Sequence, residues 1–190
     1  MSVEANAAEI LERGRTELDR LVDQAIKLIP SHRPARDRLE ALSYLAEKAS
    51  KIVQPSTPCR KGCAHCCHIA VAINSLEAEV IGRYTGRVPR RLPATAADVR
   101  DRLDNNVTRF SRKPCTFLGA DNECTIYPVR PLPCAVHHSI EASADNCDLV
   151  HNAGAKVSEI DLTRLYMASV GIAMSAGATF GDIREFFPAE

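Results

Sequence analysis

The most constraining feature of the sequence is a run of nine residues, positions 59–67, that contains four of the eight cysteines. They are Cys59, Cys63, Cys66 and Cys67, and the other four, in one later stretch, are Cys115, Cys124, Cys134 and Cys147. Thiolate sulfur is a soft ligand that suits zinc, cuprous copper and iron–sulfur clusters. Close cysteine pairs lose little chain entropy when they close around an ion. We therefore predict that the two groups meet in space around metal, with all eight cysteines as candidate ligands.

The local geometry of the first run has two alternatives. If the run is helical, its four cysteines lie on one helix face, because they are spaced by four, seven and eight residues. If the chain turns at Gly62, Cys63 and Cys66 instead form a metal-binding knuckle. Adjacent Cys66 and Cys67 do not easily point at one small tetrahedral centre. Two four-sulfur centres and one cluster with spare thiols are both compatible with this spacing.

The N-terminal sequence and the overall composition limit the functions that the cysteines can have. Residues 1–6 are polar and acidic, without the basic start and apolar run of a secretory signal. We therefore expect a cytoplasmic protein with reduced thiols, which argues against disulfides. The longest uncharged run, 165–181, has 17 residues, and a membrane span needs about 20. Net charge is zero and Trp is absent, so neither a membrane nor a nucleic acid is an expected partner.

Helical periodicity dominates the first half of the chain. Apolar spacing predicts helices over 2–29 and 34–53, and Pro30 between them indicates an antiparallel hairpin. We expect this hairpin to form core, and the alternative is a helix pair that binds a protein partner. Asn74 and Glu77 form a capping-box pattern at the start of a further helix to residue 84. Thr95 is the expected cap of a helix to Phe110, with Ala96, Val99, Leu103, Val107 and Phe110 on one face.

The second half of the chain contains an irregular insert. From 111 to 147 the helical period disappears among prolines, and only 125–127 is expected to form a short strand. Helical spacing returns over 158–178, and a short helix near Ile183 ends the chain. The predicted fold is mainly α, with one helical domain over 1–190 and a Cys/Pro-rich insert stapled by metal. Its parts are a hairpin (1–53), a cysteine region (54–150) and C-terminal helices (151–190).

The cysteine spacing resembles a known family. The pattern of the first run, together with Pro-Cys-Thr-Phe-Leu (114–118), Glu-Cys-Thr-Ile-Tyr (123–127) and Arg-Pro-Leu-Pro-Cys (130–134), is similar to the YkgJ-like cysteine-cluster family of zinc- or iron-chelating domains. Ser139 and Cys147 extend the match. The resemblance implies a small intracellular bacterial metalloprotein; some relatives belong to flagellin lysine methylase proteins, and many have no assigned activity. The family usually has Arg directly after the cysteine that matches Cys134. This chain has Ala135 there, so no role of that Arg is carried over.

Other side chains near the cysteines are candidates for a supporting role. His65, His68, His137 and His138 could each supply a nitrogen ligand, although a surface or supporting role is favoured. Arg130 and Tyr127 are better candidates for such support, because an Arg offsets the negative charge of thiolates. There is no glycine-rich phosphate-binding loop, and hence no sign of a dinucleotide or S-adenosylmethionine pocket.

Three functions follow from these features. The first is an intracellular protein that chelates zinc or iron through a split cysteine cluster, in a structural or metal-handling role. The second is an iron or iron–sulfur metalloenzyme or redox protein with the same cysteines as ligands. The third is a helical adaptor with a structural metal staple. The sequence does not decide whether the protein is an enzyme.

Overall fold

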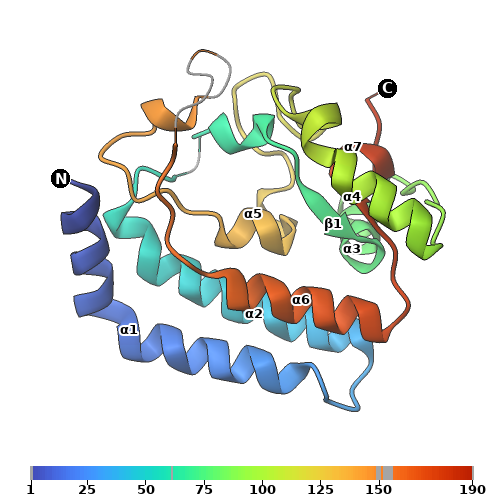
Figure 1. The fold of residues 1–190 in the computed structure, drawn as a ribbon, viewed down its shortest axis with the longest axis horizontal. Helices are drawn as coiled ribbons and strands as arrows, with labels where there is room; N and C mark the ends of the chain where they lie inside the picture. The colour runs from blue at the N-terminus through green and yellow to red at the C-terminus, as the bar shows by residue number, and fades with distance from the viewer. Residues whose placement is uncertain (1, 61, 149–150, 152–155, 190) are drawn as a thin grey trace.

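The fold of this chain is mainly α, as predicted. The computed structural model describes residues 2–60, 62–148, 151 and 156–189. Within them the α-helices are α1 (Val3–Leu28), α2 (Ala35–Val53), α3 (Ser75–Thr85), α4 (Ala96–Phe110), α5 (Leu132–Val136), α6 (Thr163–Ser175) and α7 (Ile183–Phe186). Strands β1 (Ala72–Asn74; labelled in Figure 1) and β2 (Phe180–Asp182) pair antiparallel. None of the helices in these residues is both long enough and apolar enough to cross a bilayer.

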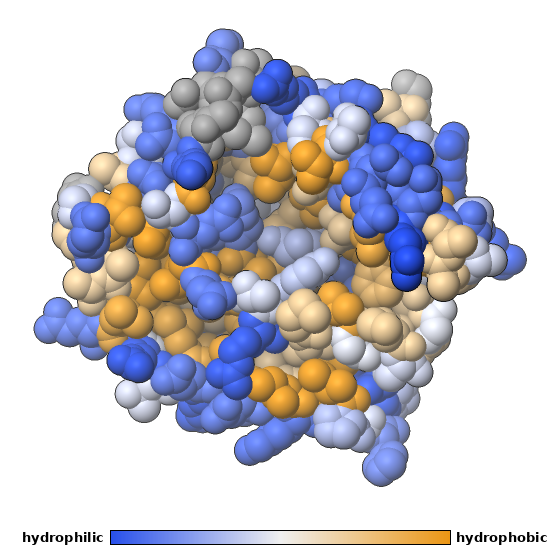
Figure 2. Space-filling view, viewed as in Figure 1, coloured by the Kyte–Doolittle hydropathy of each residue, from blue (hydrophilic) through white to orange (hydrophobic). Residues whose placement is uncertain are grey.

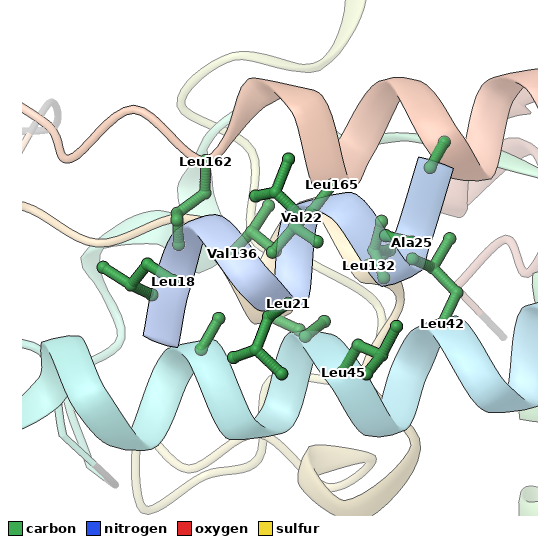
Figure 3. Close-up of a cluster of buried hydrophobic side chains, with 14 of the residues drawn as sticks. Leu18, Leu21, Val22, Ala25, Leu42, Leu45, Leu132, Val136, Leu162 and Leu165 are labelled. Atoms are coloured by element: carbon green, nitrogen blue, oxygen red, sulfur yellow. The ribbon is translucent and has the colours of Figure 1, made fainter. Parts of the chain in front are cut away.

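A first hydrophobic core joins the N-terminal hairpin to the later helices. The apolar faces of α1 and α2 pack on each other and on α5 and α6, which lie alongside them in Figure 1. Leu21, Leu42 and Leu165 come from three helices and are fully buried in the cluster between them (Figure 3). The hairpin therefore uses most of its apolar residues inside the chain, as the core interpretation predicted, and leaves Leu11, Ile26 and Tyr44 exposed.

A second core forms where the C-terminal segment returns to the middle of the chain. Strand β2 pairs with β1, so that Gly181 lies opposite Ile73. Around this two-stranded sheet, Ile73, Ile81, Phe186 and other apolar side chains are buried. Cys115, Cys124 and Cys134 are partly buried against this second core. Three of the candidate ligands are therefore held by apolar packing, whatever else they bind.

Local capping signals predicted the starts of α3 and α4 correctly. Asn74 accepts hydrogen bonds from the backbone of Leu76 and Glu77, and Glu77 accepts one from the Asn74 backbone. Thr95 accepts a hydrogen bond from the backbone N–H of Asp98. Both caps depend only on residues within one turn, which is why the sequence alone shows them.

The apolar face predicted for α4 is not the face that the fold buries. Leu103 and Val107 are 41% and 67% exposed, whereas Arg102 and Asn106 are each 7% exposed. Arg102 is buried because its guanidinium donates hydrogen bonds to the carbonyls of Pro93 and Phe180 and to the Thr179 hydroxyl. Tertiary hydrogen bonding has therefore overridden the apolar stripe of this helix.

Two further expectations need correction. Residues 127–129 form a 3₁₀ turn in place of the predicted strand over 125–127. The last long helix begins at Thr163, later than expected, because Ser139 and Glu159 form a bridge that holds the preceding chain extended. The expected boundary between the cysteine region and the C-terminal helices falls at 150–151, and residue 150 lies outside the described residues. The division of the chain into one domain with three parts stays a prediction.

Replacement of Thr95 by alanine tests the cap of α4. We expect the free energy of unfolding to fall by about 1 kcal/mol, because the first turn loses a hydrogen-bond acceptor. Thr108→Ala is the matched control, since Thr108 is exposed inside the same helix and caps nothing. Urea denaturation of both variants measures the difference. Equal stability of the Thr95 variant and the parent protein would contradict the assignment.

Candidate metal centre

All eight cysteines line a single cavity of about 320 Å³, which we call the cysteine cavity. Its walls come from four separate segments: the first cysteine run, the loop that carries Cys115 and Cys124, α5 with Cys134, and a 3₁₀ turn with Cys147. All eight thiols are free and partly buried. Figure 2 shows that the face seen in Figure 1 is hollowed near its middle and that apolar residues gather around the hollow. The predicted meeting of the two cysteine groups is thus a property of the fold.

The first cysteine run turns at Gly62 and does not continue as a helix. Gly62 has a φ of 89°, a conformation that favours glycine, and the N–H of Cys63 donates to the carbonyl of Arg60. The next residues form the 3₁₀ helix η2 (His65–His68), which carries Cys66 and Cys67. Of the two geometries that the sequence allowed, the structure has the knuckle.

Backbone hydrogen bonds hold the later cysteines beside this knuckle. The N–H of Cys115 donates to the carbonyl of Cys67, with an N–O distance of 2.7 Å. The N–H of Arg112 donates to the carbonyl of His68, also at 2.7 Å. On the other side of the cavity, the N–H of Ser139 lies 3.3 Å from the Cys59 sulfur. These hydrogen bonds hold the two cysteine stretches beside each other.

The thiols fall into two groups with Cys66 between them. Burial raises the pKa of Cys59 to about 11, with further contributions from the thiols of Cys63, Cys66 and Cys147. Burial also raises the pKa of Cys134 well above its usual value, and there the neighbouring thiols are Cys66, Cys115 and Cys124. We call Cys59, Cys63 and Cys147 the outer group, and Cys115, Cys124 and Cys134 the inner group.

Arg130 is a cation beside Cys66, Cys124 and Cys134, whereas Cys115 lies near Arg184. The pKa of all three thiols near Arg130 is raised, by burial at Cys124 and Cys134 and first by the hydrogen bond with Cys67 at Cys66, and the positive charge of Arg130 partly offsets this rise. The guanidinium stacks over the Tyr127 ring at 4.4 Å and donates a hydrogen bond to the Ser50 hydroxyl. Arg130 and Tyr127 thus both line the cysteine cavity, which is where the sequence suggested that they would act.

Sequence reasoning missed Arg184, whose guanidinium donates hydrogen bonds to the backbone of both cysteine stretches. Its side chain is 8% exposed and donates hydrogen bonds to the carbonyls of Cys67, Ile69, Lys113 and Pro114. It also pairs with the fully buried Asp182 at 2.8 Å. Asp182 and Glu185 form a capping box at the start of α7, and this pattern was the one local signal in the sequence.

The histidines lie in different environments. His138 is 2% exposed; burial, and then the charge of Arg130, lower its pKa to about 4. Its Nε2 lies 3.0 Å from the Ser50 hydroxyl oxygen. His137 places Nδ1 3.1 Å from a Glu159 carboxylate oxygen. His65, His137 and His138 line the cysteine cavity, whereas His68 is not among its lining residues.

The donors fit a soft metal, but they are not yet in ligand positions. Among the residues that the structure describes, no group of three or more Cys, His, Asp or Glu side chains is already arranged to hold one ion. Metal ligation would require small movements of the thiols and loss of their protons. Because burial holds the thiol pKa values high, metal binding at neutral pH would release protons.

Comparison with protein families identifies the region that carries these cysteines. The model of the CxxCxxCC family, described as "Putative zinc- or iron-chelating domain", matches residues 58–153, slightly more than half of the chain. The chain belongs to the CxxCxxCC family. The matched range contains every cysteine of this family member, so the resemblance noted in the sequence is confirmed. Comparisons with curated proteins and with solved structures gave no match.

Proposed function

We propose that this CxxCxxCC-family protein binds zinc or iron inside the cysteine cavity, in a structural or metal-handling role. The observation that carries the proposal is that eight free thiols from four separate segments line one cavity. The family description supports chelation of zinc or iron. The proposed ligands are all or most of Cys59, Cys63, Cys66, Cys67, Cys115, Cys124, Cys134 and Cys147. Free thiols at these positions also support a reducing compartment, the cytoplasm.

The outer and inner groups favour two neighbouring centres, or one larger cluster that spans both. Each group contains three cysteines, and a tetrahedral site takes four ligands. We assign Cys66 and Cys67, which follow each other in the 3₁₀ helix η2 and both line the cavity, one to each group. Arg130 would offset part of the negative charge of the inner thiolates.

A second candidate function is an iron or iron–sulfur redox protein or enzyme. The supporting observation is that all eight cysteines line the cysteine cavity together with His65, His137 and His138, so that the donors outnumber the four ligands that one zinc ion takes. An iron–sulfur cluster would supply electron transfer, and His137 with its partner Glu159 would lie on the cavity wall beside it. The adaptor function has no comparable support, because the hairpin buries its apolar faces within the chain.

Metal content of cysteine variants tests the proposed ligands. We expect Cys63→Ser, in the outer group, and Cys134→Ser, in the inner group, each to lower the bound metal by about half or more, because each removes one ligand of a four-ligand centre. The measurement is elemental analysis after anaerobic purification, together with an absorption spectrum. Colourless wild-type protein with near-stoichiometric zinc, grown with ample iron, would exclude the cluster function.

Met174→Ser is the matched control. It also removes a sulfur atom, but Met174 is 67% exposed and is not among the residues lining the cysteine cavity. Its metal content should equal that of the wild type. Unaltered metal content in both cysteine variants would contradict the ligand assignment, and metal-free wild-type protein with normal folding would contradict the proposed function itself.

A further inference from the structure

Glu77 of α3 carries a buried carboxylate that is not among the proposed metal ligands. The residue is 9% exposed, and its side chain joins the end of β1 and the start of α3 to the start of α5. Its Oε2 accepts hydrogen bonds from the backbone N–H of Asn74 at 3.1 Å and from the Asn74 side-chain amide at 2.7 Å. Its Oε1 accepts one from the backbone N–H of Leu132 at 2.8 Å. One oxygen thus serves the local helix cap, whereas the other reaches a residue 55 positions away.

The hydrogen bond to Leu132 holds the short helix that carries Cys134. Leu132 is the first residue of α5; Pro131, which precedes it, provides no side-chain acceptor, and Pro133 has no N–H. The N–H of Cys134 donates to the Pro131 carbonyl at 2.9 Å, within the same turn. The bond to Glu77 therefore ties this turn to a different part of the fold, two residues before a thiol that lines the cysteine cavity.

Helix α5 lies between the two hydrophobic cores. Leu132, Ala135 and Val136 are buried in the first core, whereas Cys134 packs partly against the second. Apolar burial is non-directional, so it fixes the depth of a helix better than its position along its own axis. A hydrogen bond has a defined length and direction. The bond from Leu132 to Glu77 therefore fixes where along α5 the Cys134 thiol meets the other inner thiols.

The carboxylate of Glu77 is buried without a cation beside it. Asp182 pairs with Arg184, whereas no cation of the described chain pairs with Glu77. Burial raises the pKa of Glu77 from its ordinary value of 4.5 to about 7, although the hydrogen bonds from Leu132 and Asn74 lower it. Because the pKa is raised, the contribution of this group to stability is present below pH 4.5 and is lost as the pH rises through 7. Buried ionisable groups of this kind are frequent at functional sites.

We propose that Glu77 is the positioning residue of Cys134: its hydrogen bond to Leu132 sets α5 so that the Cys134 thiol completes the inner group. The effect on metal rests on the proposed function, whereas the position of Cys134 requires no metal. Glu77 should therefore control the metal affinity of the inner group and leave that of the outer group unchanged.

The variant Glu77→Gln separates the two tasks of this side chain. Glutamine also serves in a capping box, and its single oxygen should stay at Asn74, where two donors converge. Its amide nitrogen would then face the N–H of Leu132, and two donors do not bond to each other. The matched control is Glu185→Gln, because Glu185 accepts from the backbone N–H of Asp182 in the capping box of α7.

Zinc affinity is measured for one cysteine group at a time, by competition with a chromophoric chelator under anaerobic conditions. In a Cys63→Ser background, which keeps the inner group, Glu77→Gln should weaken zinc binding by about tenfold, the effect of one hydrogen bond to a charged group. In a Cys134→Ser background, which keeps the outer group, it should leave zinc binding unchanged. Equal weakening in both backgrounds, or the same weakening by Glu185→Gln, would overturn the proposal.

Alkylation of the metal-free protein tests the position of Cys134 without zinc. Iodoacetamide should modify Cys134 about tenfold faster in Glu77→Gln than in the wild type, because the loss of one hydrogen bond makes local opening of α5 easier. Cys124, which lies outside α5, should react at the same rate in both proteins, as peptide mass spectrometry can show. Wild-type protein that binds no zinc but shows this selective change would reject the metal function and keep the positioning role. Equal rates at Cys134 would reject the positioning role.

The Leu132 amide of the wild-type protein provides a test that needs no variant. If Glu77 accepts its hydrogen bond, this amide should exchange with solvent as slowly as the amide of Ala135, which donates to the Pro131 carbonyl. Rapid exchange at Leu132 beside slow exchange at Ala135 would overturn the proposal, even if Glu77→Gln does not fold.

Discussion

Replacement of Arg184 by methionine is expected to lower the free energy of unfolding by about 3–5 kcal/mol, because it leaves the buried carboxylate of Asp182 unpaired. Arg184 is 8% exposed and Asp182 is fully buried. The variant also leaves the carbonyls of Ile69, Lys113 and Pro114 without their donor. Chemical denaturation followed by circular dichroism measures the effect. We expect weaker metal retention as well, since these carbonyls position both cysteine stretches.

Arg20→Met is the matched control for this prediction. Arg20 also pairs with a carboxylate, that of Glu17, but it lies on the exposed face of α1, where water screens the pair. Its loss should leave stability and metal content unchanged. A similar small effect of Arg184→Met would show that apolar packing alone holds the cysteine stretches in place.

Metal removal is expected to disorder the outer cysteine group and to leave the inner group folded. Cys115, Cys124 and Cys134 pack against the second hydrophobic core, whereas Cys59, Cys63 and Cys147 belong to neither core. After chelation, the amide hydrogens of Cys63 and Cys147 should exchange at least about a hundredfold faster, which corresponds to about 2.7 kcal/mol of local stability. Hydrogen exchange with NMR detection measures each amide separately.

The internal control is the amide of Thr125, which donates to the carbonyl of Phe117 inside the second core. It should keep its protection after chelation, as should the amides of α1 and α2. Uniform loss of protection would show that the metal supports the whole fold. Unchanged exchange at Cys63 and Cys147 would show that the outer group does not depend on metal.

Features that depend on near neighbours were predictable. The cap at Asn74 and the limits of α1 and α2 follow from residues within a few positions, so pattern and propensity sufficed. The inner face of α4 was not predictable in this way. Leu103 and Val107 of its apolar stripe are exposed, and the buried side chains are Arg102 and Asn106. Distant acceptors, such as the Phe180 carbonyl, decided that orientation.

In the candidate site, too, some features were predictable from residue spacing and others depend on distant residues. Cysteine spacing predicted that 59–67 and 115–147 would meet, and it placed the chain in its family. It did not choose between a helix and a knuckle at Gly62, because both satisfy the spacing. It also did not show Arg184, whose five hydrogen-bond partners include four carbonyls about 70 to 117 positions away.

The sequence alone determined a mainly α chain and a set of eight thiols suited to a soft metal, because ligand chemistry and helical period are properties of residue type and spacing. Only the tertiary structure decided which thiols are neighbours and which of them a hydrophobic core supports. The reason is physical. Which side chains are buried, and which groups they hydrogen-bond to, depends on segments that are far apart in the sequence. The pairing of β2 with β1 brings such segments together, and no local sequence pattern encodes that pairing.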